Sequence, residues 1–109
     1  MELEKRARKA VARWFELEGH AVLDRGFEGF VVVIEDGELV FAKVFAERGM
    51  DFPNGHVTRA EFERVIAQWL VRGDRPIDLP VRCDCVDVAV LADDRAIVRR
   101  VTNCLEVAR

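Results

Sequence analysis

Two apolar runs flank an Asp-Gly pair in the stretch GFVVVIEDGELVFAKVF, which spans residues 29–45. An Asp-Gly pair between apolar runs favours the two-residue type I′ turn of a β-hairpin. A turn at Asp36-Gly37 sets Glu35 opposite Glu38 and thereby fixes the pairing of every residue behind them. This hairpin constrains the fold more tightly than any other part of the sequence.

The register of the hairpin sorts its side chains onto two faces, because successive residues of a strand point to opposite sides. The first face, called the aromatic face below, carries Phe30, Val32, Ile34, Leu39, Phe41, Lys43 and Phe45. The second face carries Val31, Val33, Glu35, Glu38, Val40, Ala42 and Val44. Both faces are apolar near the middle, which predicts a central hairpin with a covering layer on each side.

The segments around the hairpin supply those layers. Apolar residues recur at helical spacing over residues 2–18, and Thr58 and Glu61 form a capping box for a second helix that Gly73 ends. The remaining chain predicts strands at 20–25 and 81–91, a last strand or a strand with a tail at 96–107, loops at 26–29, 46–56 and 74–80, and a turn at Asp93-Asp94. The order α-β-β-β-α-β-β predicts one α/β (α+β) domain over residues 1–109, in which helices cover both faces of a mixed sheet of about five strands.

The composition is that of a soluble globular protein, with 50% hydrophobic and 34% charged residues. The longest uncharged apolar run, residues 30–34, is too short to cross a bilayer, and the first residues lack the apolar core of a signal peptide. We therefore expect a cytoplasmic protein with no membrane partner. The net charge of -3 excludes a global basic field for nucleic acid, so any such contact needs a local basic patch.

The three cysteines, Cys83, Cys85 and Cys104, are an odd number in a chain without a secretory signal, so a disulfide framework is not expected. Together with His20 and His56 they suggest a zinc site, but no CxxC or HxxxH pair completes a tetrahedral set. Alternation along a strand points Cys83 and Cys85 to one face, where free thiols pack as small apolar groups. We predict core cysteines, with no bound metal and no cofactor.

The segments ARWFELEGHAVLDR, GFVVVI, LVFAKVF, VTRAEFERVIAQWL and VRCDCVDVAV follow one another along the chain. In this order they resemble the YraN-like family of small bacterial proteins, which have a restriction-endonuclease-like fold and are described as endonucleases. The family has Gly-Glu-Ile-Asp-Leu-Ile in place of GFVVVI and a Val-Phe-Val-Glu-Val-Lys type of strand in place of LVFAKVF. The resemblance covers most of the chain and implies a restriction-endonuclease-like core.

In such a nuclease, carboxylates on the hairpin hold a divalent cation, and a lysine beside them stabilises charge at the scissile phosphate. The resemblance assigns each of these groups to a position in this chain. The carboxylates fall on Phe30 and Val32 of the first strand, on Lys43 of the second strand and on or beside Arg8 and Lys9 of the first helix, and the lysines fall on Phe45 of the second strand and on Glu61 of the second helix. None of these positions carries the side chain that the nuclease mechanism requires there, so no catalytic residue is expected.

Two functions follow from these substitutions. The first is a catalytically inactive nuclease-fold protein that acts as a nucleic-acid or protein interaction module. The alternative is a DNA endonuclease for branched or damaged DNA, which would use Mg²⁺ or Mn²⁺ and the displaced acidic residues Glu28, Asp84 and Asp87. The lack of a carboxylate pair on the aromatic face favours the first function.

The aromatic face itself has two interpretations. It is either filled as ordinary core or open as an interface, for a partner protein or for a second copy of the chain. Lys43 stands among apolar neighbours and needs a partner, for which Glu28, Asp84 and a glutamate of the first helix are candidates. Arg82 and Asp84 are alternate residues of one strand and are expected to form an ion pair.

The most basic local surface is a stripe on the first helix formed by Arg6, Lys9 and Arg13, at spacings i, i+3 and i+7. Arg99 and Arg100 make a second candidate patch. Glutamates interleave with the stripe, as on an ordinary solvated helix face. The stripe is nevertheless the best candidate for contact with DNA.

Overall fold

The structure is a computed structural model that describes residues 2–73 and 78–107. Its elements follow the predicted order, α-β-β-β-α-β-β, with one short helix added at the end. In chain order they are α1 (Glu2–Leu17), β1 (Ala21–Phe27), β2 (Phe30–Glu35), β3 (Glu38–Arg48), α2 (Arg59–Arg72), β4 (Val81–Ala92), β5 (Arg95–Val101) and α3 (Cys104–Val107). The predicted α+β class and layout are confirmed.

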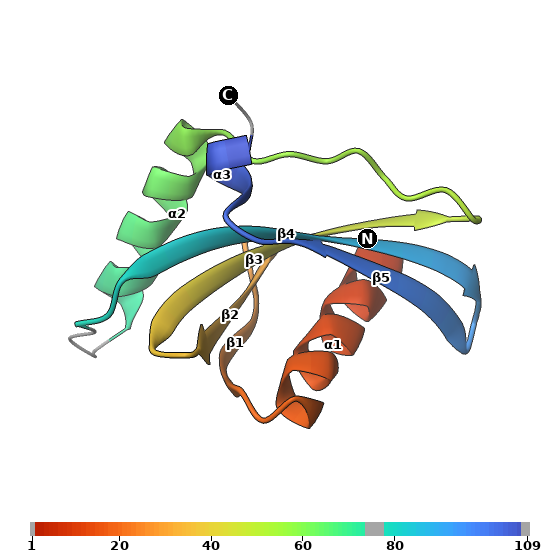
Figure 1. Cartoon of the computed structure of the whole chain (residues 1–109), viewed down its shortest axis with the longest axis horizontal. Helices are drawn as coiled ribbons and strands as arrows, with labels where there is room; N and C mark the ends of the chain where they lie inside the picture. Colours follow the sequence, from red (N-terminus) through yellow and green to blue (C-terminus); the bar gives the residue numbers. More distant parts are fainter. Residues whose placement is uncertain (1, 74–77, 108–109) are drawn as a thin grey trace.

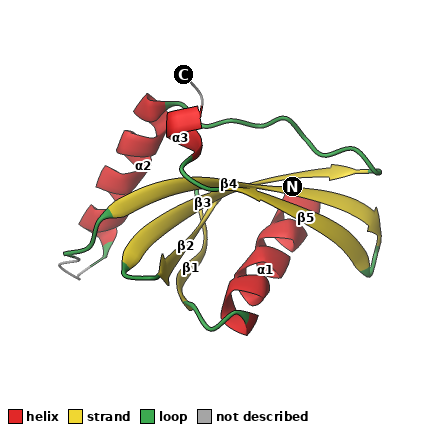
Figure 2. Ribbon diagram, viewed as in Figure 1, coloured by secondary structure: helices red, strands yellow, loops and turns green. Residues whose placement is uncertain are grey.

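The five strands form one mixed sheet in the order β1-β2-β3-β4-β5. Strands β3 and β4 are parallel, since α2 and its loops carry the chain across one face of the sheet, and the other neighbours are antiparallel. Figure 1 shows α1 and α2 on opposite sides of this sheet, and the same arrangement is coloured by element type in Figure 2. No helix within residues 2–73 and 78–107 is both long and apolar enough to cross a membrane.

The hairpin turn has the predicted geometry. Asp36 and Gly37 have φ angles of 51° and 78°, as a type I′ turn requires at both central positions. Glu35 pairs with Glu38, and Phe30 at the far end pairs with Lys43. The predicted register is therefore confirmed along the whole hairpin, and so is the division of its side chains into two faces.

A core lies on each side of the hairpin. On the α1 side, Val11 and Phe15 of the helix pack against Val31, Val33 and Val40 of the sheet, and all five side chains are fully buried. On the α2 side, the aromatic face packs against the second helix. The members of that second core that are fully buried are Phe30, Val32, Leu39, Phe41, Val57 and Val65. The prediction of a layer on both sides is confirmed.

The aromatic face is thus filled from within the chain, which favours the first of its two interpretations, ordinary core, over an open interface. A homodimer or partner interface through Phe30, Val32 and Phe41 would need these side chains at the surface, but their exposed fraction is 0%. Because α2 covers them, a partner could reach them only after the helix had moved away from the sheet.

Helix α2 begins and ends where the sequence predicts. The side chain of Thr58 accepts a hydrogen bond from the backbone N–H of Glu61 at 3.1 Å, as in a capping box. At the other end, the N–H of Gly73 donates to the carbonyl of Trp69. The predicted turn at Asp93-Asp94 also joins the last two strands as expected.

Three strand ends differ from the prediction, and the first is that of β1, which continues to Phe27, inside the predicted loop 26–29. Strand β3 continues to Arg48, inside the predicted loop 46–56, because β4 runs beside it and Arg48 pairs with Val90. The predicted last strand, 96–107, ends at Val101. The chain then turns at Asn103, whose φ is 52°, and enters α3. Of the predicted loop 74–80, residues 74–77 lie outside the described part of the chain.

Candidate functional site

Lys43 occupies the centre of the region where the resemblance places a metal site. Its ammonium group lies 3.0 Å from a carboxylate oxygen of Glu61, at the start of α2, and 3.2 Å from the backbone carbonyl of Glu28. The same group lies 4.9 Å from the centroid of the Phe30 ring, within the range of a cation–π contact. The Lys43 and Glu61 side chains are only 19% and 30% exposed, which shields the ion pair from solvent.

The expected partners of Lys43 were largely wrong. Glu28 contributes its carbonyl oxygen and not its carboxylate, while Asp84 and α1 lie on the opposite side of the sheet. The actual carboxylate partner, Glu61, could have been found in the sequence. The resemblance expects an acid where Lys43 stands and a lysine where Glu61 stands, so the two substitutions exchange the charges of one pair.

The turn before β2 fits closely around Lys43. Gly29 has a φ of 85°, and a Cβ atom built there would lie 2.9 Å from the Lys43 Nζ atom. The left-handed backbone therefore favours glycine at this position, and a larger residue would also have to displace the Lys43 ammonium group. The lysine side chain is held between the turn, the Phe30 ring and the first turn of α2.

Aromatic rings fill the rest of the aromatic face. The ring of Phe41 makes edge contacts with those of Phe30, Phe62 and Trp69, at centroid distances of 6.3, 6.0 and 5.5 Å. Val32 is fully buried in the same cluster, and Phe45 packs against it while remaining partly exposed. At these positions the side chains stabilise the core and offer no oxygen atom to a cation.

A second polar cluster lies on the α1 side of the sheet, centred on Asp84. This carboxylate is fully buried and accepts hydrogen bonds from Arg82 at 2.9 and 3.0 Å and from Arg100 at 2.6 and 3.0 Å. The backbone N–H of Asn103 donates a further bond at 3.0 Å. The expected Arg82–Asp84 ion pair is confirmed, as one part of a larger network.

Glu35, beside the hairpin turn, completes this network. It accepts hydrogen bonds from Arg82 at 2.5 Å and from Arg100 at 2.8 Å, and His20 lies 3.3 Å away. The hydrogen bond from Arg100 is the main reason why the pKa of Glu35 falls to about 2, since burial acts in the opposite direction. The same contacts raise the pKa values of both arginines. These charges neutralise one another, as in a structural network.

The acidic residues of the alternative endonuclease do not assemble. Glu28 lies at the turn before β2 on the α2 side, whereas Asp84 is enclosed by arginines on the α1 side. Asp87 is on the α2 side and pairs with Arg99 at 2.8 Å. Across residues 2–73 and 78–107, no three His, Cys, Asp or Glu side chains are grouped so that they could hold a metal ion. One cation cannot be shared by Glu28 and Asp84.

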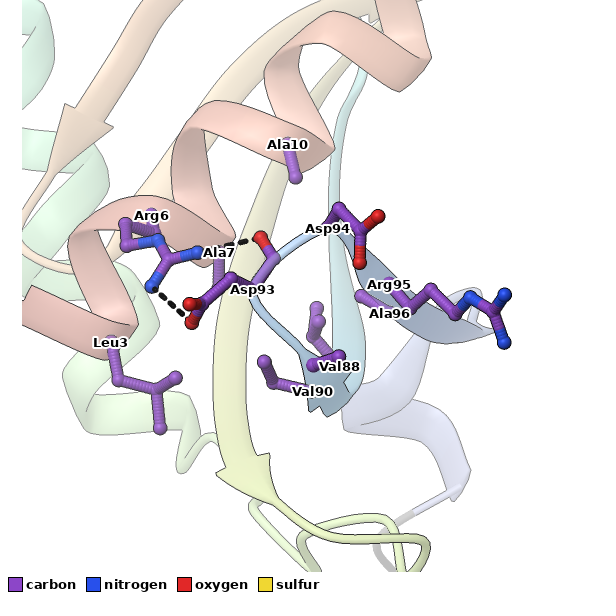
Figure 3. A pocket seen from close by; sticks show the side chains of 11 residues that line it. Leu3, Arg6, Ala7, Ala10, Val88, Val90, Asp93, Asp94, Arg95 and Ala96 are labelled. Atoms are coloured by element: carbon purple, nitrogen blue, oxygen red, sulfur yellow. Dashed lines mark hydrogen bonds and ion pairs between the residues drawn. The ribbon is translucent and has the colours of Figure 1, made fainter.

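One of the three side chains in the basic stripe of α1 is engaged in a contact within the chain. Figure 3 shows Arg6 turned toward the β4–β5 turn, where its guanidinium donates to the carbonyl of Asp93 at 2.8 Å and lies 3.8 Å from the Asp93 carboxylate. Lys9 and Arg13, one and two turns farther along, are exposed. In the second candidate patch, Arg99 stays exposed but pairs with Asp87, and Arg100 belongs to the buried network.

The three cysteines meet in the α2-side core. The sulfur atoms of Cys83 and Cys104 are 3.5 Å apart, Cys85 belongs to the same core cluster, and all three thiols are free and buried. Core placement is therefore confirmed. His56 lines a cavity beside Cys85 and Cys104, while His20 lies at the Glu35 network on the other side.

No protein-family model and no curated protein matches this chain. The likeness to the YraN-like family therefore rests on the five quoted segments, and the function is inferred from the geometry around Lys43.

Proposed function

We propose that the chain is a catalytically inactive nuclease-fold protein that acts by binding. The observation that carries this proposal is the Lys43–Glu61 ion pair, 3.0 Å long, at the place where the resemblance expects metal-binding carboxylates. A divalent cation takes at least six oxygen ligands and favours several anionic ones. Here the nearest charge is the ammonium group of Lys43, which repels a cation and is already paired with the carboxylate of Glu61.

The exchange of charges explains how the fold would stay stable after the loss of nuclease activity. An acid at position 43 and a lysine at position 61 would attract each other as Lys43 and Glu61 do now. The pair keeps the first turn of α2 attached to β3. Metal binding, in contrast, depends on the sign of the charge at each position, and it is lost by the exchange.

The alternative function, metal-dependent cleavage of branched or damaged DNA, has less support from the geometry. It requires Glu28, Asp84 or Asp87 to act together around Mg²⁺ or Mn²⁺. Two of these carboxylates are engaged by arginines, and Glu28 is separated from Asp84 by the sheet.

For the binding role, we propose that Lys9 and Arg13 on the outer face of α1 contact the phosphate backbone of nucleic acid. They are exposed, they lie one helical turn apart, and no core residue would have to move. A contact of this kind positions the protein on nucleic acid but carries no sequence specificity, since it does not involve the bases.

This binding role is tested by a gel-shift titration of duplex DNA at several salt concentrations. We expect the binding constant to fall with salt, and the double variant Lys9→Ala/Arg13→Ala to reduce the log–log slope by about 2, because each neutralised phosphate contributes about 0.9 to it. The matched control is Arg59→Ala/Arg64→Ala, which removes the same charge from α2 on the opposite side of the sheet.

An equal loss of binding in both double variants would point to net charge alone and contradict the assignment to α1. The absence of any shift at low salt would remove nucleic acid as the partner and leave a protein partner for the same module.

A further inference from the structure

The three cysteine thiols form a contact cluster whose members come from two elements. Cys83 and Cys85 are alternate residues of β4 on its α2 side, and Cys104 is the first residue of α3. The distance between the sulfur atoms of Cys83 and Cys104 is 3.5 Å, which a modest side-chain rotation could reduce to the bond length of about 2 Å in a disulfide.

A cavity of about 260 Å³ leads to this cluster. Cys104 and Cys85 are part of its wall, with His56 and Arg99, whereas Cys83 lies behind them and does not line it. Cys104 is the most exposed of the three cysteines, at 8%. A small molecule in the cavity would therefore meet Cys104 and Cys85, and would reach Cys83 only through them.

Asp87, from the same wall, offers a hydrogen-bonding position to such a molecule. One of its carboxylate oxygens is held by Arg99 at 2.8 Å. The other, Oδ1, is buried and has no hydrogen-bond partner among the described residues. A small neutral molecule with O–H groups can donate to this oxygen, while the carboxylate disfavours an anionic oxidant.

We propose that this cluster is a peroxide-reactive thiol site, in which hydrogen peroxide oxidises Cys104 and Cys83 then closes a disulfide with it. The thiolate of Cys104 attacks one oxygen of the peroxide, the O–O bond breaks, and hydroxide leaves as Cys104 becomes a sulfenic acid. The sulfur of Cys83 then attacks that of Cys104, the S–O bond breaks, and the Cys83 proton leaves with the hydroxyl group as water. Two thiols are oxidised by two electrons and the peroxide is reduced.

The cavity and the hydrogen bonding together assign the two roles, because Cys104 lines the cavity and Cys83 does not. Donation from Cys83 and Cys85 lowers the pKa of Cys104, because it stabilises the thiolate. The same bonds, with burial, raise the pKa values of Cys83 and Cys85, so both stay protonated donors. Cys104 is therefore the attacking sulfur, and Cys83, at 3.5 Å, is the resolving one.

The test exposes the reduced, folded protein to hydrogen peroxide, alkylates the remaining thiols in urea, and maps them by mass spectrometry without reduction. A protease that cleaves before Asp84 separates Cys83 from Cys85. We expect the loss of two of the three thiols, a peptide pair linked through Cys83 and Cys104, and an alkylated Cys85.

Two variants check the roles. In Cys104→Ala, Cys83 and Cys85 should both remain alkylatable after the same exposure. In Cys83→Ser/Cys85→Ser, whose hydroxyl groups can still donate to the Cys104 thiolate, Cys104 should accumulate as a sulfenic acid that dimedone traps. If a variant folds poorly, the disulfide linkage mapped in the unmodified chain still tests the proposal.

Retention of all three thiols by the folded protein, at a peroxide exposure that oxidises the urea-unfolded chain, would overturn the proposal. So would a mixture of linkages in the folded protein that matches the mixture formed by the unfolded chain, because it would show no selection of Cys104 and Cys83.

Discussion

Replacing Asp84 with alanine is expected to lower the free energy of unfolding by about 3–5 kcal/mol, the largest effect of any single substitution considered for this chain. Asp84 is fully buried and accepts bonds from two arginines and one backbone N–H. Without its carboxylate, Arg82 and Arg100 are left in the interior with Glu35 as their main neutralising partner. An uncompensated buried charge costs more than the ion pair itself contributes.

The measurement is urea denaturation of the unmodified chain and the variant, followed by linear extrapolation to water. The matched control is Glu63→Ala on the exposed side of α2, which removes the same charge and should change stability by about 0.5 kcal/mol or less. If Asp84→Ala were no more destabilising than Glu63→Ala, the network around Asp84 would not be holding β4 and β5 to the hairpin turn.

The second large effect is a loss of stability in acid that depends on Glu35. The pKa of this carboxyl falls from its ordinary value of 4.5 to about 2 in the folded protein, chiefly because Arg100 donates to it. Between these values the unfolded chain binds a proton that the folded protein does not. The stability due to Glu35 is therefore complete above about pH 5 and disappears as the pH falls through 2.

A tenfold difference in proton affinity corresponds to about 1.4 kcal/mol, so Glu35 contributes about 3 kcal/mol across this range. The check is a series of urea denaturation curves from pH 7 to pH 2 for the unmodified chain and for Glu35→Gln. The two proteins should differ most at neutral pH and converge in acid. Parallel curves, with a constant difference at every pH, would contradict the assignment.

Much of the fold could be predicted because its signals are local. The Asp36-Gly37 turn sets the register of the hairpin, and the Thr58 cap and Gly73 bound the second helix. Each of these signals lies within a few residues of the structure that it specifies. The continuation of β3 to Arg48 was not predicted, because it depends on pairing with β4, which lies about forty residues farther along the chain.

The polar clusters were harder to predict for the same reason. The pairing of Arg82 with Asp84 was visible as an alternation on one strand, but Glu35 and Arg100 join them only through the sheet. Cys104 reaches the other thiols because the chain turns at Asn103, where the sequence had suggested a continuing strand. The Lys43–Glu61 ion pair joins β3 to α2. Only the charges that the resemblance expects at both positions pointed to it.

Binding without cleavage is tested most directly by incubating the purified protein with linear and branched DNA in Mg²⁺ or Mn²⁺. With Lys43 and Glu61 paired where metal ligands would be needed, we expect no cleavage above that of a metal-free control. Metal-dependent cleavage that disappears in Glu28→Gln or Asp87→Asn would contradict this expectation. It would place a working metal site on Asp87, which pairs with Arg99, or on Glu28, which lies beside Lys43.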